Sequence, residues 1–239
     1  MPSLTGKAAL AQMLIAEGVE YIFGNPGTSE TPLLDVLQDY PQLKYIQALQ
    51  EGTAVGMADG YARATGRPAI ANIHIAGGLA NGISGLYNAF RGGTPLGLTA
   101  GNSDTRMMLQ EPTLSGDLVE MTSQFTKWSA EILHPGDVPL AMRRAFKEAK
   151  TPPEGPVFLS FPWNTMDETS DVEIAGSAPG FFRTRPDVAA IEQASSLLSH
   201  CQNPLIVVGD RVAQSGAASE LVLDDGRYSM LREGKILHR

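Results

Sequence analysis

The chain has 239 residues, a formal charge of −8 at neutral pH and an ordinary apolar content of 43%. This length suffices for one large domain or one domain and part of another, and the acidic balance argues against nucleic acid or an anionic membrane as a partner. Its single cysteine, Cys201, excludes an internal disulfide and a cysteine-based zinc site, so a reducing, cytoplasmic compartment is expected.

Helical and strand patterns alternate along the first 165 residues. Leu10, Met13 and Leu14 recur at helical spacing before Gly18, a good helix terminator, and polar residues interrupt this stretch so that it does not resemble a secretion signal. In chain order, the expected elements are a helix at 6–17, a strand at 19–23, a helix at 30–38, a strand at 43–49, a helix at 51–64, a strand at 68–75, a helix at 78–90, a strand at 95–100, a helix at 137–149 and a strand at 156–161.

Residues 68–75 are almost continuously apolar, as in a strand that helices cover on both faces. Together with the regular alternation of elements, this pattern predicts an α/β fold with a doubly wound parallel sheet over residues 1–166. No apolar run approaches the length that a membrane-spanning helix requires.

Three segments with different composition and periodicity follow this domain. Residues 167–186 lack periodicity and are expected to form a linker, and residues 187–225 begin a second α/β domain that stays incomplete, with a helix to about 199 and a strand at 204–209. Residues 226–239 carry four basic residues and one acid, which suggests an appended tail, although a solvated terminal segment would have the same composition.

Three polar loops follow three of the apolar runs. They are Gly24–Glu30, the segment that begins Gln50-Glu51-Gly52, and Asn72–Asn81. Because the carboxyl ends of parallel strands share one edge of a sheet, these loops are expected to converge. A lone glutamate where a strand passes into a helix of small residues suits a buried acid that acts on a cofactor ring.

Taken singly, each motif has an ordinary structural interpretation. A glutamate in a first helical turn usually complements the helix dipole, and an Asn-Pro-Gly sequence is usually a turn. Similarly, His74 in an apolar strand could be a hydrogen-bonded core residue, and Asn81 could be a polar residue at a helix start. The motifs become specific only in combination.

In combination, the three loops, Phe125-Thr-Lys-Trp128 and Gly155–Pro162 resemble the pyrimidine-binding domain of thiamine-diphosphate-dependent 2-oxo-acid decarboxylases and acetolactate synthases. The benzoylformate decarboxylases are the nearest branch. The resemblance covers residues 3 to about 165, and residues 187 to about 223 resemble the start of the family's central domain.

This resemblance implies a cofactor site around Glu51. In the family a buried carboxyl group shares a proton with a nitrogen of the cofactor's aminopyrimidine ring, and burial is expected to raise the pKa of that carboxyl group. Glu51 matches this position, while Pro26 and Gly27 match the loop that flanks the pyrimidine and Asn81 matches a further residue beside the cofactor.

The resemblance also implies two residues that face the substrate. Thr28 stands where the benzoylformate branch has a serine near the substrate carboxylate, and the extra methyl group of threonine narrows the pocket. His74 matches an active-site proton donor or acceptor. The adjacent histidine pair of pyruvate decarboxylase relatives is missing, since the matching region reads Ala100-Gly-Asn-Ser-Asp-Thr105, so a simple pyruvate decarboxylase is not expected.

Family members hold the diphosphate through magnesium in a C-terminal domain marked by Gly-Asp-Gly and a later Asn-Asn, and neither pattern occurs in this sequence. The chain is therefore expected to supply half of a site, completed by a second copy or by a complementary subunit that carries the diphosphate domain. No metal ligands are expected in this chain.

The expected reaction is decarboxylation or carboligation of a 2-oxo acid, as in benzoylformate decarboxylase, with this chain inactive when alone. An acetolactate synthase-like enzyme and a non-catalytic, partner-dependent subunit remain as alternatives. Which 2-oxo acid is used does not follow from the sequence.

Overall fold

The computed structural model describes residues 2–178, 185–202, 205–209, 211–222, 229–232 and 235–237. The chain divides into two compact units, Met1–Phe182 and Arg183–Arg239. Cys201 is exposed and belongs to the second unit. Among the described residues, no helix combines the length and the apolar composition that crossing a bilayer would need.

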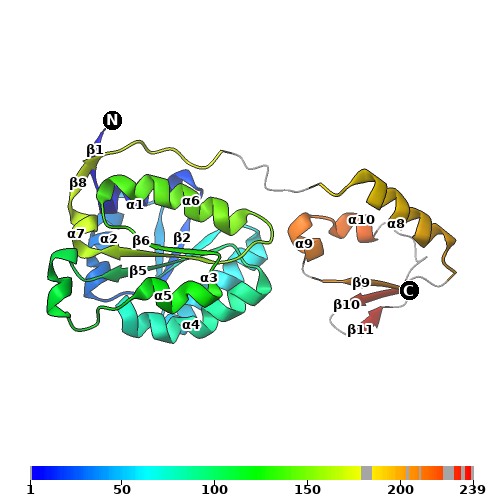
Figure 1. The fold of residues 1–239 in the computed structure, drawn as a ribbon, viewed down its shortest axis with the longest axis horizontal. Helices are drawn as coiled ribbons and strands as arrows, with labels where there is room; N and C mark the ends of the chain where they lie inside the picture. Colours follow the sequence, from blue (N-terminus) through cyan, green and yellow to red (C-terminus); the bar gives the residue numbers. More distant parts are fainter. Residues whose placement is uncertain are drawn as a thin grey trace. The chain divides into compact units, whose positions relative to one another are not determined.

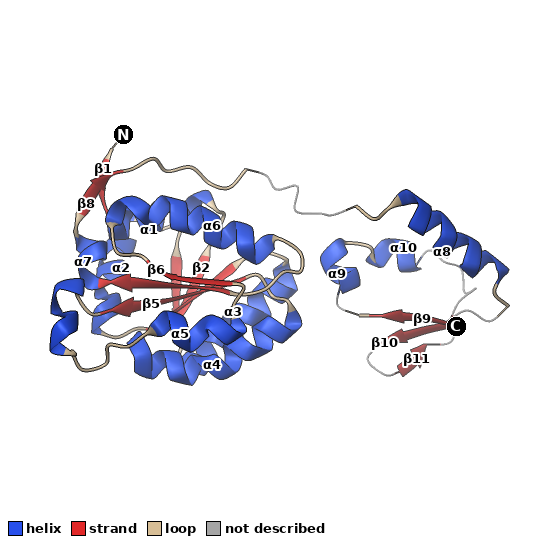
Figure 2. Ribbon diagram, viewed as in Figure 1, coloured by secondary structure: helices blue, strands red, loops and turns tan. Residues whose placement is uncertain are grey.

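A six-stranded parallel sheet forms the centre of the first unit, in the order β3-β2-β4-β5-β7-β6 (Figures 1 and 2). This architecture confirms the α/β fold class predicted from the sequence. The strands of the sheet are β2 (Tyr21–Asn25), β3 (Lys44–Gln47), β4 (Ala69–Ile73), β5 (Leu96–Asn102), β6 (Trp128–Glu131) and β7 (Val157–Pro162).

Helices cover both faces of this sheet, with α1 and α6 on one side and α3, α4 and α5 on the other (Figure 1). Successive residues of a strand point to opposite faces, so Ile22 packs in the core beneath α1 while Phe23 packs in the core beneath α3. The α-helices are α1 (Gly6–Ala16), α2 (Thr31–Val36), α3 (Glu51–Thr65), α4 (Ile75–Gly92), α5 (Leu118–Thr122), α6 (Val138–Lys150) and α7 (Trp163–Asp167). The short 3₁₀ helices are η1 (Thr28–Glu30), η2 (Leu37–Asp39), η3 (Thr105–Gln110), η4 (Ser123–Phe125) and η5 (Pro135–Asp137).

Helices α3 and α4 lie close together because they are rich in small residues. A β-carbon on Gly85 would come within 2.9 Å of the Val55 side chain, so the approach of the two helices requires glycine there. Helix α3 ends at Gly66, whose φ of +67° is the left-handed conformation typical of a glycine after a helix. This packing fixes the start of α3 against the start of α4, where two of the polar loops meet.

The segment expected to be a linker begins on the first unit. Strand β8 (Thr169–Asp171) pairs antiparallel with β1 (Ser3–Thr5). Ser177 then donates from its backbone nitrogen and its hydroxyl group to Glu17, each over 2.6 Å. Residues 179–184 of the expected linker lie outside the described residues.

The second unit contains α8 (Val188–His200), α9 (Arg211–Ser215), α10 (Ala218–Val222) and the three-stranded sheet β11-β10-β9. Strand β9 (Leu205–Val208) pairs in parallel with β10 (Ser229–Arg232), which pairs antiparallel with β11 (Lys235–Leu237). Two segments of the expected tail, residues 226–239, therefore form strands, and residues 226–228, 233–234 and 238–239 lie outside the described part of the chain.

Several observed elements differ from the expected ones. Helix α4 begins at Ile75 and not at residue 78, which moves His74 to the residue preceding the helix. Helix α5 and strand β6 were not expected at all. Strand β6 is an edge strand whose residues are all half-buried, so it lacks the continuous apolar pattern that reveals β4 and β7.

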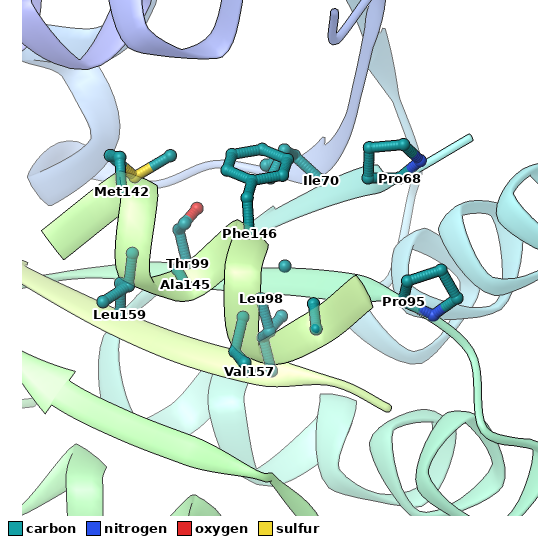
Figure 3. A pocket seen from close by; sticks show the side chains of 12 residues that line it. Pro68, Ile70, Pro95, Leu98, Thr99, Met142, Ala145, Phe146, Val157 and Leu159 are labelled. Carbon is teal, nitrogen blue, oxygen red and sulfur yellow. The ribbon is translucent and has the colours of Figure 1, made fainter. Parts of the chain in front are cut away.

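An apolar cavity lies between α6 and the amino ends of β4, β5 and β7, with Phe146 and Met142 above it and Pro68 and Pro95 at its rim (Figure 3). Its volume is about 10 Å³, roughly the room that one water molecule needs. It is too small for a cofactor. The polar loops lie at the opposite, carboxyl edge of the sheet.

Candidate active site

The site lies at the carboxyl edge of the sheet, where β2 and β4 are neighbours. From β2 the chain continues to β3 on one side, and from β4 it continues to β5 on the other. Such a reversal of strand order opens a crevice in which α/β proteins commonly bind ligands. The loop Gly24–Glu30 follows β2, Glu51 follows β3 and His74 follows β4, so the structure brings the three predicted loops together.

Glu51 is buried, and its carboxylate accepts hydrogen bonds from two amide side chains. Asn25 Nδ2 donates to Oε1 over 2.9 Å, and Asn81 Nδ2 donates to Oε2 over 3.1 Å. Gly78 lies against the same carboxyl group, since a β-carbon there would come within 3.0 Å of Glu51 Oε1. Each carboxylate oxygen thus has one donor from a neighbouring loop.

The net effect of these contacts is that the pKa of Glu51 lies below its ordinary value. Burial raises the pKa, but the bond from its own backbone N–H, the amides of Asn81 and Asn25 and, when the imidazole ring is protonated, the charge of His74 together lower it by more. Burial thus acts on this pKa in the expected direction, but the net pKa is lowered and not raised, because the hydrogen bonds outweigh burial. The amide donors favour the charged form of the carboxyl group.

A second glutamate, Glu30, is buried more completely, with 2% of its surface exposed. Its Oε1 accepts from Ser29 Oγ and from the backbone nitrogen of Gly101, each over 2.7 Å. Its Oε2 accepts from the backbone nitrogen of Gly27 over 2.9 Å and contacts His74 Nδ1 at 2.8 Å. Four polar groups, from the loop after β2, from the residue before α4 and from strand β5, therefore converge on one carboxylate.

The backbone around His74 is unusual. Ile75, the next residue, has a φ of +36°, which is rare for a β-branched side chain, and this turn carries the chain from β4 into α4. Gly27 lies against the imidazole ring, and a β-carbon on it would come within 2.2 Å of His74 Nδ1. Glycine is needed at this position because of that approach, since its φ of −119° is open to any residue.

The other predicted site residues lie on the same loops. Pro26 is half-buried beside Gly27, and Asn81 is exposed in the second turn of α4, with its side chain on Glu51. Thr28 is exposed, and its side chain makes no hydrogen bond within the described residues. The structure thus joins Asn81 to Glu51 and Gly27 to His74, and leaves the Thr28 hydroxyl free among the residues it describes.

Sequence reasoning missed Asn25 and Glu30 as parts of this site. One signal could have indicated Glu30, because an acidic side chain three residues after a turn commonly bonds back to the turn's backbone, as Glu30 does to Gly27. For Asn25, which belongs to the noted Gly24–Glu30 loop, no separate signal exists, because its role depends on how the ends of β2 and β3 align.

In the described part of the chain, no three His, Cys, Asp or Glu side chains come together in a way that could hold a metal ion. A flat heteroaromatic ring with a protonatable nitrogen matches the donor set better. Glu51 offers an ionised acceptor to such a ring nitrogen.

Comparison with known proteins identifies the family to which this domain is similar. Residues 4–121 match the family described as thiamine pyrophosphate enzyme, N-terminal TPP binding domain. This match contains all three polar loops, and thus the surroundings of both Glu51 and Glu30.

Individual relatives extend the similarity over nearly the whole chain. Benzoylformate decarboxylase of Pseudomonas aeruginosa is 36% identical over 224 residues, which cover 91% of this chain and 42% of the relative. A probable acetolactate synthase large subunit of Methanocaldococcus jannaschii is 30% identical over 92% of this chain and 38% of its own length. The crystal structure of benzoylformate decarboxylase from Polynucleobacter necessarius superposes with a TM-score of 0.86 and 33% identity, over 95% of this chain and 43% of that one. This chain therefore spans about two fifths of the length of the relatives it matches.

Proposed function

Because residues 4–121 are an N-terminal TPP binding domain of the thiamine pyrophosphate enzymes, we propose that this chain binds the pyrimidine half of thiamine diphosphate for the conversion of a 2-oxo acid. The proposed reaction is the decarboxylation or carboligation of an aromatic 2-oxo acid, as the name of the benzoylformate decarboxylase relative suggests. An acetolactate synthase-like activity is the second candidate, supported by the similarity to the archaeal large subunit.

The observation that supports this proposal most strongly is the pair of amides on the buried Glu51 carboxylate. When bound, thiamine diphosphate would supply a thiazolium carbon that adds to the carbonyl carbon of the 2-oxo acid. Glu51 would bind the aminopyrimidine through a ring nitrogen and share a proton with it. Asn25 and Asn81 keep the carboxylate oriented and ionised, so the shared proton would reside mainly on the ring.

His74 and Thr28 are proposed to contact the substrate. Both lie on loops next to Glu51, and both carry groups that can bond a carboxylate or a hydroxyl group. Pro26 and Gly27 are proposed to flank the pyrimidine ring, since the backbone can approach a ligand closely at glycine.

Magnesium is proposed to bind outside this chain, together with the diphosphate. Most of the affinity for a polyanionic cofactor comes from the metal and from backbone groups that cradle the phosphates. We therefore propose that this chain alone binds thiamine diphosphate weakly and that a complementary subunit with a diphosphate domain completes the site. A non-catalytic, partner-dependent subunit is the remaining possibility.

Calorimetric titration of the full chain with thiamine diphosphate and magnesium, followed by a carbon dioxide release assay, tests the incomplete site. Weak binding without turnover is expected. Tight, magnesium-dependent binding with turnover would contradict the proposal. The gene directly downstream is also informative, because a Gly-Asp-Gly domain encoded there would favour a divided enzyme over a non-catalytic subunit.

The role of Glu51 is tested by supplying the diphosphate domain of a benzoylformate decarboxylase relative as a separate polypeptide. If activity is restored, Glu51→Gln should lower kcat by about 10²-fold or more, because the amide cannot share that proton. Glu131→Gln is the matched control, since Glu131 is a carboxylate at the same sheet edge that bonds Asn102 and Ser160. Equal losses in both variants would remove the special role of Glu51.

The substrate-facing residues are tested in the same complemented enzyme. His74→Ala and Thr28→Ala should depress the rate with 2-oxo acids more than they weaken cofactor binding. A matching loss of cofactor affinity would assign these residues to cofactor binding or to structure.

A further inference from the structure

Glu30 has no part in the function proposed above, yet its carboxylate is the most heavily hydrogen-bonded side chain of the site. Two of its contacts are backbone N–H groups, those of Gly27 and Gly101, which can only donate. The other two are Ser29 Oγ at 2.7 Å and His74 Nδ1 at 2.8 Å. Four groups facing two carboxylate oxygens match the four acceptor positions that an ionised carboxyl group offers.

The positions of the protons follow from this arrangement. Ser29 has a single hydroxyl proton, and it donates this proton to Glu30 Oε1. Ser29 Oγ also lies 3.1 Å from His74 Nδ1 and can only accept there. His74 Nδ1 therefore faces two acceptors, Ser29 Oγ and Glu30 Oε2, and must carry a proton itself.

If Nδ1 is the protonated nitrogen of the neutral ring, Nε2 carries the lone pair. Nε2 has no hydrogen-bond partner among the described residues, and the His74 side chain is 24% exposed. The available nitrogen of the ring is thus the one that can accept a hydrogen bond or a proton from a ligand. Fixing one ring nitrogen through a hydrogen bond is a common way to set the chemistry of the other.

We propose that Glu30 is a positioning residue that holds the neutral His74 ring in the Nδ1–H tautomer, with Nε2 available to accept a proton at the substrate. This inference rests on the proposed function for the statement that His74 faces a 2-oxo acid. The tautomer itself depends only on the contacts within this chain.

Glu30 also ties three parts of the site together. It bonds the Gly27 loop that follows β2, the histidine that precedes α4 and the backbone of Gly101 near the end of strand β5. The Glu30 charge also affects Tyr45. The pKa of the Tyr45 hydroxyl group is raised, first by its own burial and then by the negative charge of Glu30. A carboxylate in this position fixes both the ring's location and its protonated nitrogen.

The tautomer can be measured directly by long-range ¹H–¹⁵N correlation spectra of the full, ¹⁵N-labelled chain at alkaline pH, where the ring is neutral. The His74 signals are assigned by their loss in His74→Gln. The wild-type protein should show protonated Nδ1 and unprotonated Nε2. Glu30→Gln replaces the carboxylate by a neutral amide that cannot accept from four donors. In this variant the spectrum should shift toward the Nε2–H form.

Two further variants separate the contributions. Glu51→Gln changes the other buried glutamate and should leave the His74 tautomer as in the wild type. Ser29→Ala removes the second acceptor on Nδ1 while keeping Glu30, so the Nδ1–H form should persist. Protonated Nε2 in the wild type would overturn the proposal, as would a Glu30→Gln spectrum identical to that of the wild type.

The measurement stays decisive if Glu30→Gln does not fold, because the wild-type and Ser29→Ala spectra alone report whether Glu30 suffices to hold the tautomer. It uses no cofactor, so tight, magnesium-dependent binding with turnover by this chain alone, or equal losses in Glu51→Gln and Glu131→Gln, would count against the proposed function and leave this result unaffected.

Discussion

Two buried glutamates lie at the same edge of the sheet, and their surroundings differ in one respect. Glu30 accepts from two backbone nitrogens, a serine and a histidine, whereas Glu51 accepts from two asparagine side chains, at the end of β2 and in α4. Backbone donors cannot turn away without moving the main chain, but side-chain amides can rotate. The comparison indicates that Glu30 is part of the framework and that Glu51 remains able to exchange partners with a ligand.

The largest expected difference concerns the removal of each carboxylate. Glu30→Ala should destabilise the first unit by about 3–5 kcal/mol, because several buried donors lose their acceptor. Glu51→Ala should change stability by less than about 1 kcal/mol, since Asn25 is only half-buried and Asn81 is exposed, so both can bond water. Urea unfolding followed by tryptophan fluorescence reports this unit, which contains Trp128 and Trp163. Equal losses would break the comparison.

A second contrast uses the glycine beside each glutamate. Gly27→Ala should destabilise by about 1–3 kcal/mol, because its methyl group would overlap the His74 ring that Glu30 holds. Gly78→Ala should lose less than about 1 kcal/mol, because the contact at 3.0 Å is with the Glu51 side chain, which can move by a few tenths of an ångström. The same unfolding assay measures both, and a larger loss at Gly78 would contradict the assignment.

Much of the fold could be predicted because β4 and β7 are buried along their whole length and therefore read as continuous apolar runs. The edge strand β6 has a mixed pattern that local sequence does not distinguish from a loop. Glu51 was found through its motif. Two partners of Glu30, Gly27 and Ser29, are close to it in sequence, but His74 and Gly101 meet it only through the alignment of three strands in space.

A smaller effect is expected from the donors of Glu51. Asn25→Ala should raise the pKa of Glu51, since it removes a hydrogen bond that favours the charged carboxylate, and should lower stability by less than about 1 kcal/mol. The carboxyl ¹³C shift of Glu51 during an acid titration measures the pKa. An unchanged or lower pKa would show that Asn25 does not hold the carboxylate in its charged form.

The smallest effect appears only in acid. The folded pKa of Glu51 lies below the ordinary value of 4.5, so its ionisation stabilises the fold fully above that pH, and this contribution is lost as the pH falls through the folded pKa. The stability difference between wild type and Glu51→Gln should therefore shrink between about pH 6 and pH 3. Urea midpoints of both proteins across this range test it, and a difference that grows in acid would reverse the sign of the pKa shift.

The positive φ of Ile75 links the hydrophobic core to the chemistry of the site. A positive φ at a β-branched residue persists only where its surroundings hold it, and here the side chain is buried at the first residue of α4, directly after His74. Removing one methyl group from that side chain, as in Ile75→Val, would loosen the restraint on the turn and therefore on the imidazole ring. The packing of a buried apolar side chain thus helps to determine where the proton-accepting nitrogen of the site lies.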